Sequence, residues 1–394
     1  MSRSPGPLPT VRLDGPPSRA ELVARLLILL ALLFGFLVAI ETMSKAIKML
    51  ATAGFLGGGD SNELFRGVSN PFAGLALGVL FTVVVQSSST TTSTLVAVVG
   101  SGALSVEHAV PMVLGANIGT TITNTLVSIG HMRRSIEFRR AFAAATVHDF
   151  FNLSMVAIFL PLEIFTGALS KTAYWLTGLL AGGSGAEYKS PIKSSIKFVH
   201  KQILGTVEAL GLEGTALGAT CLVVGIALTL ACLYLITKNM RLVIAGQIEA
   251  GMNRILESSG IVPLLVGIGI TVAVQSSSIT TSLLVPMCAA GVLSLKQAFP
   301  VMLGANIGTT VTALLASLAQ DNEAALTIAL VHVLFNFGGV VLVYPFAAVR
   351  NIPQRMARQL ALRSSRNPVM GLVYVLIVFV LIPLSGWLLW SNGP

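Results

Sequence analysis

Two polar sequences occur twice in this chain, each time at the same separation. Gln-Ser-Ser-Ser occupies 86–89 and 275–278, and Gly-Ala-Asn-Ile-Gly-Thr-Thr occupies 115–121 and 304–310, so both return 189 positions later. Hydroxyl and carbonyl oxygens can replace the water shell of a small hard cation, while serine hydroxyls, glutamine amides and helix N-termini donate hydrogen bonds to oxyanions. The repeated residues are therefore suited to binding an anion and a cation side by side.

A third block extends the repeat at a slightly smaller offset. Val-His-Asp-Phe-Phe-Asn at 147–152 matches Val-His-Val-Leu-Phe-Asn at 331–336. Asp149 is the one acidic residue well inside an apolar window of the repeat, and its counterpart is Val333. A carboxylate in such surroundings is costly unless it binds or pairs with a cation, which favours a functional role over a position at a helix end. For the histidine that precedes it in both copies we expect a packing or supporting role rather than proton transfer.

Membrane helices are the elements expected to hold these residues. The chain has 394 residues, of which 54% are apolar and 10% charged, and its mean hydropathy is +0.83. This composition excludes a water-soluble globular protein and indicates an all-α polytopic membrane protein, because no apolar–polar alternation typical of barrel strands is present. The windows long enough to cross a bilayer core of about 30 Å are 26–40 and onward, 71–99, 109–129, 141–165, 215–236, 261–291, 324–349 and 370–390.

An alternative explanation exists for each repeated hydroxyl taken singly. Serine and threonine in membrane helices often only hydrogen-bond to their own helix or to a neighbour. This alternative does not explain the set, because packing does not require five consecutive polar residues and does not require the same run twice.

Basic residues between the windows predict how the chain crosses the membrane. The first copy is followed by four arginines between 133 and 140, whereas the second is followed by Asp321, Asn322 and Glu323 without a base. Because basic loops stay in the cytoplasm, the first loop is predicted to lie inside and the second outside, which makes the copies inverted repeats. The same loops account for the net charge of +9, so nucleic acid is not an expected partner.

Crossing parity requires one segment of each copy to enter and leave on the same side. The better candidate is 71–100, since an almost unbroken polar run at 86–94 marks its centre. We expect a re-entrant helical hairpin with Gln-Ser-Ser-Ser near its tip there and in 261–291. The Gly-Ala-Asn-Ile-Gly-Thr-Thr segments are expected to form broken helices or to allow close backbone approach. A stripe of lysines four residues apart lies in the segment 182–214, which this scheme puts outside, and predicts a helix on the membrane surface.

The chain is predicted to have five parts. They are a cytoplasmic N-terminal tail (1–25), the first transmembrane helix with the first copy (26–170), an extracytoplasmic linker (171–214), a linker helix with the second copy (215–350), and a cytoplasmic basic loop with the last transmembrane helix (351–394). The three cysteines lie in apolar windows without the spacing of metal ligands, so no disulfide or metal role is expected.

Longer stretches of the first copy resemble a known transporter family. The segments 117–121, 123–125, 137–142 and 146–152 closely resemble the type II sodium-dependent phosphate cotransporters, whose signature is the duplicated Gln-Ser-Ser-Ser. The likeness runs from about Leu33 to Trp390. The chain is similar to bacterial-type members, because the long glycosylated loop of the animal proteins is here the short stretch 182–214.

This resemblance implies electrogenic import of inorganic phosphate driven by sodium across the cell membrane. It also implies cytoplasmic termini, no catalytic residues and no cofactor besides the coupling sodium ions. Charge-moving members carry Asp at the position of Asp149 and electroneutral ones Gly. Animal relatives have Gln, Asp and Ser where this chain has His131, Arg134 and Ala305. The residues expected to contact phosphate are Gln86, Ser87, Ser88, Ser89, Gln275, Ser276, Ser277 and Ser278. The residues expected to hold sodium are Asp149, Asn117, Thr120, Thr121, Asn306, Thr309, Thr310 and Thr312.

Other functions are less consistent with the sequence. An intramembrane serine hydrolase using a repeated serine with His148 or His332 predicts one active copy and a Gly-x-Ser-x-Gly turn, whereas both copies are intact and that turn is absent. A channel is a second alternative, but paired hairpins around a central site suit alternating access better. Within the transporter class, another tetrahedral oxyanion or proton coupling remains open.

Overall fold

The computed structural model describes residues 19–53, 67–181, 191–257 and 260–390, with the backbone alone for 241–257. Every regular element in these ranges is helical, which confirms the all-α class, and seven of the helices are long and apolar enough to cross a membrane. The helices are α1 Arg19–Thr52, α3 Pro71–Val85, α4 Ser88–Gly100, α5 Val106–Gly119, α6 Ile122–Ile129, α7 Ser135–Thr166, α8 Ala168–Ala181, α9 Pro191–Glu208, α10 Gly214–Glu257, α11 Ile261–Val274, α12 Ser277–Ala290, α13 Leu295–Ser317, α14 Glu323–Val343, α15 Ala347–Arg366, α16 Pro368–Leu376, a π-helical turn Ile377–Leu381 and α17 Ile382–Trp390.

Each Gln-Ser-Ser-Ser run forms the tip of a helical hairpin. Hairpin 1 consists of α3 and α4, and hairpin 2 consists of α11 and α12. Beside the tip of hairpin 1 a hydrogen bond of 2.9 Å joins the hydroxyls of Thr82 and Thr91, and in hairpin 2 one of 2.8 Å joins those of Thr271 and Thr280. Both pairs lie at equivalent positions of the repeat, so the two copies close their hairpins in the same way.

Glycines bring the hairpins close to the helices that carry the second motif. A Cβ on Gly115 of α5 would collide with the carbonyl oxygen of Leu75 on α3, and a Cβ on Gly304 of α13 would collide with that of Leu264 on α11. Main chain therefore packs directly on main chain in both copies. The expectation of close backbone approach at these glycines is confirmed.

The two hairpins open toward opposite ends of α13. At the start of α13, Gly291 in the link from hairpin 2 lies beside Arg140 of α7. Just beyond its end, Gln320 lies beside Gly100 at the open end of hairpin 1. Since α13 has 23 residues, these open ends are separated by about 35 Å along its axis.

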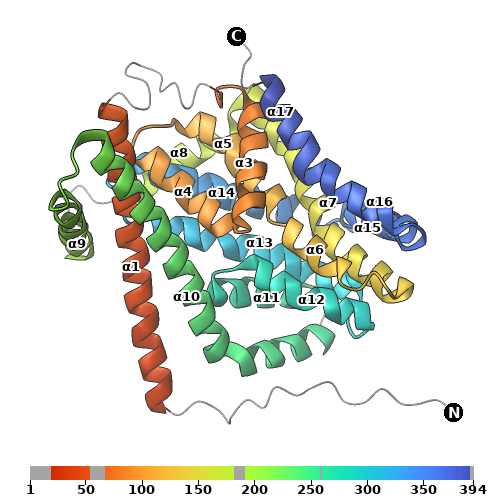
Figure 1. The fold of residues 1–394 in the computed structure, drawn as a ribbon. Helices are drawn as coiled ribbons and strands as arrows, with labels where there is room; N and C mark the ends of the chain where they lie inside the picture. Colours follow the sequence, from red (N-terminus) through yellow and green to blue (C-terminus); the bar gives the residue numbers. More distant parts are fainter. Residues whose placement is uncertain (1–18, 54–66, 182–190, 258–259, 391–394) are drawn as a thin grey trace.

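Long helices flank the hairpins on two sides. In Figure 1, α1 and α10 cross each other on one side, and α7 with α15 to α17 lie on the other. The surface helix expected from the lysine stripe is α9, which buries Ile196, His200 and Val207 and packs on α1 and α10. Its first lysine, Lys189, lies outside the described residues. Helix α10 continues to Glu257, well past the predicted end of its window.

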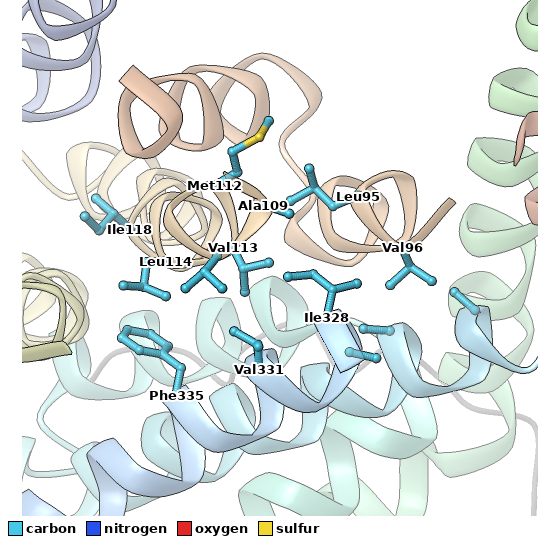
Figure 2. Packing of buried hydrophobic residues seen from close by; sticks show 14 of the residues in the cluster. Leu95, Val96, Ala109, Met112, Val113, Leu114, Ile118, Ile328, Val331 and Phe335 are labelled. Carbon is cyan, nitrogen blue, oxygen red and sulfur yellow. The ribbon is translucent and has the colours of Figure 1, made fainter. Parts of the chain in front are cut away.

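An apolar layer joins the two copies. Figure 2 shows Val113 and Leu114 of α5 above Val331 and Phe335 of α14, with Leu95 and Val96 of α4 beside them. All six side chains are at least nine-tenths buried. The layer fixes α4 and α5 of the first copy on α14 of the second.

One expectation differs from the structure. The helix break at Gly-Ala-Asn-Ile-Gly-Thr-Thr occurs in the first copy, where Thr120 and Thr121 separate α5 from α6, but α13 runs unbroken through the second. Trp390, at the end of α17, contacts Phe72 at the beginning of hairpin 1.

Candidate functional site

The two repeated glutamines share an unusual backbone conformation at the hairpin tips. Gln86 has φ 58° and Gln275 has φ 57°, and they are the two non-glycine residues with positive φ in the described chain. This left-handed conformation is uncommon for a residue with a long side chain, so the surrounding contacts must hold it. Each glutamine ends one helix of its hairpin and lets the chain turn directly into the next helix.

Matching hydrogen bonds fix the glutamine side chains. The amide nitrogen of Gln86 donates to the carbonyl of Val83 at 2.6 Å, and its amide oxygen accepts from Thr123 at 3.0 Å. In the second copy the amide nitrogen of Gln275 likewise donates to the carbonyl of Val272 at 2.6 Å. Its amide oxygen accepts from Thr312 at 2.8 Å. Thr312, which was expected to be a sodium ligand, thus positions Gln275. Thr123 positions Gln86 in the same way in the first copy.

The tips of the two hairpins meet. The hydroxyl of Ser89 donates to the backbone carbonyl of Gln275 at 3.3 Å, across the boundary between the copies. The geometry therefore brings together the two Gln-Ser-Ser-Ser runs, which lie far apart in the sequence.

Helix ends of both polarities converge at these tips. Helices α3 and α11 end there with their carbonyl groups, and α4 and α12 begin there with their amide groups. Ser87 caps α4 by accepting from the amide of Thr90, whereas Ser276 makes no such bond to α12. Helix C-termini favour cations and N-termini favour anions, so each tip can bind both kinds of ion side by side.

The threonines of the second motif turn their hydroxyl protons toward their own helices. Thr120 donates to the carbonyl of Ala116 and Thr309 to that of Ala305, both at 2.9 Å. Thr121 and Thr310 do the same to Ile118 and Ile307. A hydroxyl that donates to its helix keeps acceptor lone pairs, so these bonds remain compatible with a cation bound on the oxygen.

Asparagines connect the two copies below the tips. His148 of α7 hydrogen-bonds through Nε2 to Oδ1 of Asn306 at 2.6 Å. Asn306 donates to Oδ1 of Asn152 at 2.8 Å, and Asn152 donates to the carbonyl of Asn117 at 2.7 Å. All four residues are buried. Asn152 is not among the predicted site residues, although its repetition as Asn336 was a usable signal.

The equivalent residues of the second copy lack this network. Both ring nitrogens of His332 and the amide oxygen of Asn336 are buried without a hydrogen-bond partner among the described residues. The amide of Asn336 donates to the carbonyl of His332 within its own helix, at 3.0 Å. Neither His148 nor His332 forms a hydrogen bond with a serine of the hairpin tips in the part of the chain described, so the arrangement needed by a serine hydrolase is not formed.

Asp149 points away from this network, toward α6 and α16. It is fully buried, and its Oδ2 accepts from the hydroxyls of Tyr374 at 3.0 Å and Thr125 at 3.4 Å. The hydroxyl of Thr121 also interacts with it. Its Oδ1 has no partner in the described residues. The carboxylate thus retains an unused acceptor next to one of the motif threonines.

Three further residues at the site were missed from the sequence. Tyr374 is an isolated polar residue in the last apolar window, and Thr123 and Asn124 follow the second motif of the first copy. Asn124 accepts hydrogen bonds from Thr281 at 2.8 Å and Ser282 at 3.2 Å, which fasten hairpin 2 to α6. The repeat places Ala313 where the second copy would need an equivalent of Asn124, and Ser93 of hairpin 1 is left with an unpaired buried hydroxyl.

Charged residues that differ from the family pattern lie at the ends of the helices. Glu137 contacts Arg134 at 2.8 Å and His131 at 3.7 Å. Arg134 and His131, two of the positions at which this chain differs from animal relatives, therefore lie near the start of α7, away from the tips. At the other end, Lys197 of α9 pairs with Asp321 at 2.8 Å. The hydrogen bond to Asp321 raises the pKa of Lys197. Burial works to raise the pKa of Asp321, but Lys197 and the neighbouring lysines lower it on balance.

Comparison with known proteins assigns the chain to a family. The family model described as Na+/Pi-cotransporter matches residues 35–180 and 228–361. Sodium-dependent phosphate transport protein 2A of Rattus norvegicus is 32% identical over 442 residues, covering 91% of this chain and 68% of that protein. Sodium-dependent phosphate transport protein 2B of Homo sapiens is 33% identical over 453 residues, covering 92% and 65%. No solved structure matches significantly. The chain is therefore a multi-pass membrane protein that belongs to the Na+/Pi-cotransporter family.

Proposed function

We propose that this protein is a symporter that imports inorganic phosphate with sodium, and not an enzyme. The observation that carries the proposal is the meeting of two equivalent hairpin tips at Ser89 and Gln275, each with a glutamine held in the left-handed conformation. The 2A and 2B relatives are named as sodium-dependent phosphate transport proteins, which supports phosphate as the substrate and sodium as the coupling ion.

Phosphate is bound between the tips in this proposal. Its oxygens accept hydrogen bonds from the hydroxyls of Gln-Ser-Ser-Ser and from the first amides of α4 and α12. The uncapped start of α12 at Ser276 supports this assignment, because its amides are not occupied by the serine side chain. Both copies contribute equivalent donors, so binding holds the two halves of the transporter together.

Sodium is bound beside phosphate by neutral oxygens. The threonines and asparagines of the second motif provide hydroxyl and amide oxygens, and the ends of α3 and α11 provide carbonyls. We assign a further sodium ion to Asp149, whose unpaired Oδ1 lies in the first copy alone. Transport is then electrogenic, because this ion has no equivalent at Val333.

The two copies act as inverted repeats in the cell membrane. The opening of hairpins 1 and 2 toward opposite ends of α13 supports this arrangement. The clusters of arginine near the start of α7 and on α15 support a cytoplasmic position for that end. Movement of one copy against the other around the hairpin tips then exposes the site alternately to the two sides.

Uptake of labelled phosphate into proteoliposomes tests the proposal. We expect uptake with sodium outside and little uptake with lithium or potassium. Proton coupling predicts uptake driven by a pH gradient without sodium. Competition by sulfate and arsenate separates phosphate from other tetrahedral oxyanions. Phosphate uptake that ignores sodium would falsify the assignment.

A further inference from the structure

A cavity with arginine side chains in its lining lies far from the hairpin tips. It has a volume of about 600 Å³ and is formed by the beginning of α7, the link between α12 and α13, and α15. Arg139 and Arg140 of α7 and Arg358 of α15 line it. The link lies at the end of α12, which has 14 residues, so the cavity is about 20 Å along that helix from the tip of hairpin 2.

The three arginines are not neutralised by acidic side chains. None of them forms an ion pair with an acidic residue in the described ranges, and no acidic residue lines the cavity. The nearest carboxylate along α7, Glu137, is already paired with Arg134 and His131. Guanidinium groups that line one cavity without a counter-charge repel one another, and an anion in the cavity reduces that repulsion.

The chain makes room for this arrangement at Gly291. This glycine has φ +78°, and a Cβ there would lie 2.5 Å from Nη1 of Arg140. The positive φ therefore favours glycine where Arg140 reaches the link. The guanidinium of Arg140, an exposed residue, lies against the backbone of this link.

The equivalent place in the first copy shows that this charge is not a general property of the fold. There a smaller cavity, of about 250 Å³, lies between the α4–α5 link, the end of α13 and α1. Its lining includes Glu41, Lys45 and Asp321, and Lys45 lies 3.6 Å from Glu41 and 4.0 Å from Asp321. In this smaller cavity acidic and basic side chains lie close to each other. The arginine cavity has no acidic side chain in its lining.

We propose that the cavity lined by Arg139, Arg140 and Arg358 is a second binding site, for a phosphate group, separate from the site at the hairpin tips. Guanidinium groups present planar pairs of donors that match phosphate oxygens, and three of them around one cavity can hold a doubly charged group. The volume accommodates either free phosphate or the headgroup of an anionic phospholipid. In the orientation proposed above, the site faces the cytoplasm.

Sodium-free binding of labelled inorganic phosphate to the full chain tests this inference. The protein is placed in nanodiscs of neutral phosphatidylcholine, with potassium as the only monovalent metal cation. We expect saturable binding that weakens on the order of tenfold in Arg140→Gln and in Arg358→Gln, because each loses a charge-assisted hydrogen bond. Arg355→Gln is the matched control, since Arg355 is exposed on α15 but does not line the cavity.

A second arm distinguishes the two sources of the phosphate group. In nanodiscs that contain phosphatidylglycerol, a lipid headgroup in the cavity would displace labelled phosphate and raise the unfolding midpoint of the parent but not of the Arg140→Gln, Arg358→Gln double variant. Unchanged phosphate binding there identifies free phosphate as the ligand. The inference is overturned if neither phosphate nor phosphatidylglycerol distinguishes parent from double variant, or if Arg355→Gln loses as much. These readouts use no sodium, so they are independent of the uptake test.

Discussion

Hairpin 1 and hairpin 2 have the same backbone but different partners. Both turn at a glutamine with nearly the same positive φ, and both orient that glutamine with a threonine hydroxyl. Hairpin 2 is fastened to the other copy by Asn124, whereas Ser93 in hairpin 1 has an unpaired hydroxyl. The comparison separates the geometry of the binding tip, which is duplicated, from the contacts that support it, which are not.

The two copies also differ in the charge and in the hydrogen bonds of equivalent buried residues. The first copy carries Asp149 and a completed His148–Asn306 hydrogen bond, and the second has Val333 and an unpaired His332. Buried polar groups without partners are costly. Both copies hold buried polar atoms without a partner among the described residues, but at different places: Ser93 and Asp149 Oδ1 in the first copy, and His332 and Asn336 in the second.

The largest effect on stability is expected at the hairpin glycines that pack directly on the backbone of a neighbouring helix, a feature that both copies share. A Cβ on Gly267 would collide with the carbonyl of Val301, whereas nothing lies within 4 Å of a Cβ on Gly269 of the same helix. Gly267→Ala should destabilise the protein by roughly 3 kcal/mol through overpacking. Gly269→Ala should be neutral or stabilising, since alanine favours helix. Thermal unfolding in detergent measures both, and equal midpoints would show that the helices do not pack this closely.

Substitution of the threonine that hydrogen-bonds each glutamine should have a different effect at the two tips. Gln275 is buried and Gln86 is exposed. Thr312→Val leaves a buried amide oxygen unpaired and should cost about 2 kcal/mol. Thr123→Val should cost less than about 1 kcal/mol, because water can replace the lost hydroxyl. Sodium-dependent phosphate uptake and unfolding midpoints report the difference, and Thr312→Ser should restore function. A larger loss from Thr123→Val than from Thr312→Val would contradict this expectation.

Substitution of Asp149 tests whether the difference in charge between the two copies affects sodium binding and charge movement. Asp149→Asn keeps the shape and the acceptor toward Tyr374 but removes the carboxylate. We expect sodium affinity to fall about tenfold, which corresponds to about 1.4 kcal/mol, and the charge moved per phosphate to fall. Parallel measurement of current and labelled phosphate gives that ratio. Glu107→Gln, which removes a carboxylate at the first turn of α5, is the control. The same charge per phosphate in Asp149→Asn would show that this site does not carry the extra ion.

The smallest effect is expected at the exposed pair Lys197 and Asp321. Their side chains are 46% and 47% exposed, so Asp321→Asn should cost less than about 1 kcal/mol and less still in high salt. Because the pKa of Asp321 is lowered from its ordinary 3.8, the stabilisation is present above that value and is lost as the pH falls through the folded-state pKa. Because the pKa of Lys197 is raised from its ordinary 10.5, the stabilisation is complete below that value and lost only in stronger base. A midpoint difference that grew from pH 5 to 9 would rule out this linkage.

Sequence predicted the repeated features because they depend on local patterns. The duplicated Gln-Ser-Ser-Ser runs interrupt apolar helices, so their position at hairpin tips followed from the cost of polar groups in lipid. Glycine spacing likewise predicted close backbone approach. The resemblance to a known family extended this interpretation to the ions, and the assignment of single residues to phosphate and sodium stays a prediction.

The differences between the copies were less accessible. Whether a helix containing Gly-Ala-Asn-Ile-Gly-Thr-Thr breaks depends on packing around it, and the same seven residues form α13 without interruption but end α5. The roles of Asn124, Asn152 and Tyr374 arise from contacts between segments far apart in the chain, which no spacing reveals. The cytoplasmic position of the chain ends, which the resemblance implies, stays a prediction.

The direct packing of main chain on main chain at Gly115 and Gly304 has a mechanical consequence. With no side chain between them to change rotamer, α3 with α5, and α11 with α13, have no clearance to slide past each other. Each pair then behaves as a stiff lever, and strain applied at one end is carried to its hairpin tip. Between the two levers, a 3.3 Å hydrogen bond from Ser89 to Gln275 joins the tips. The contact between the levers at the tips is thus less close than the packing of main chain on main chain within each lever.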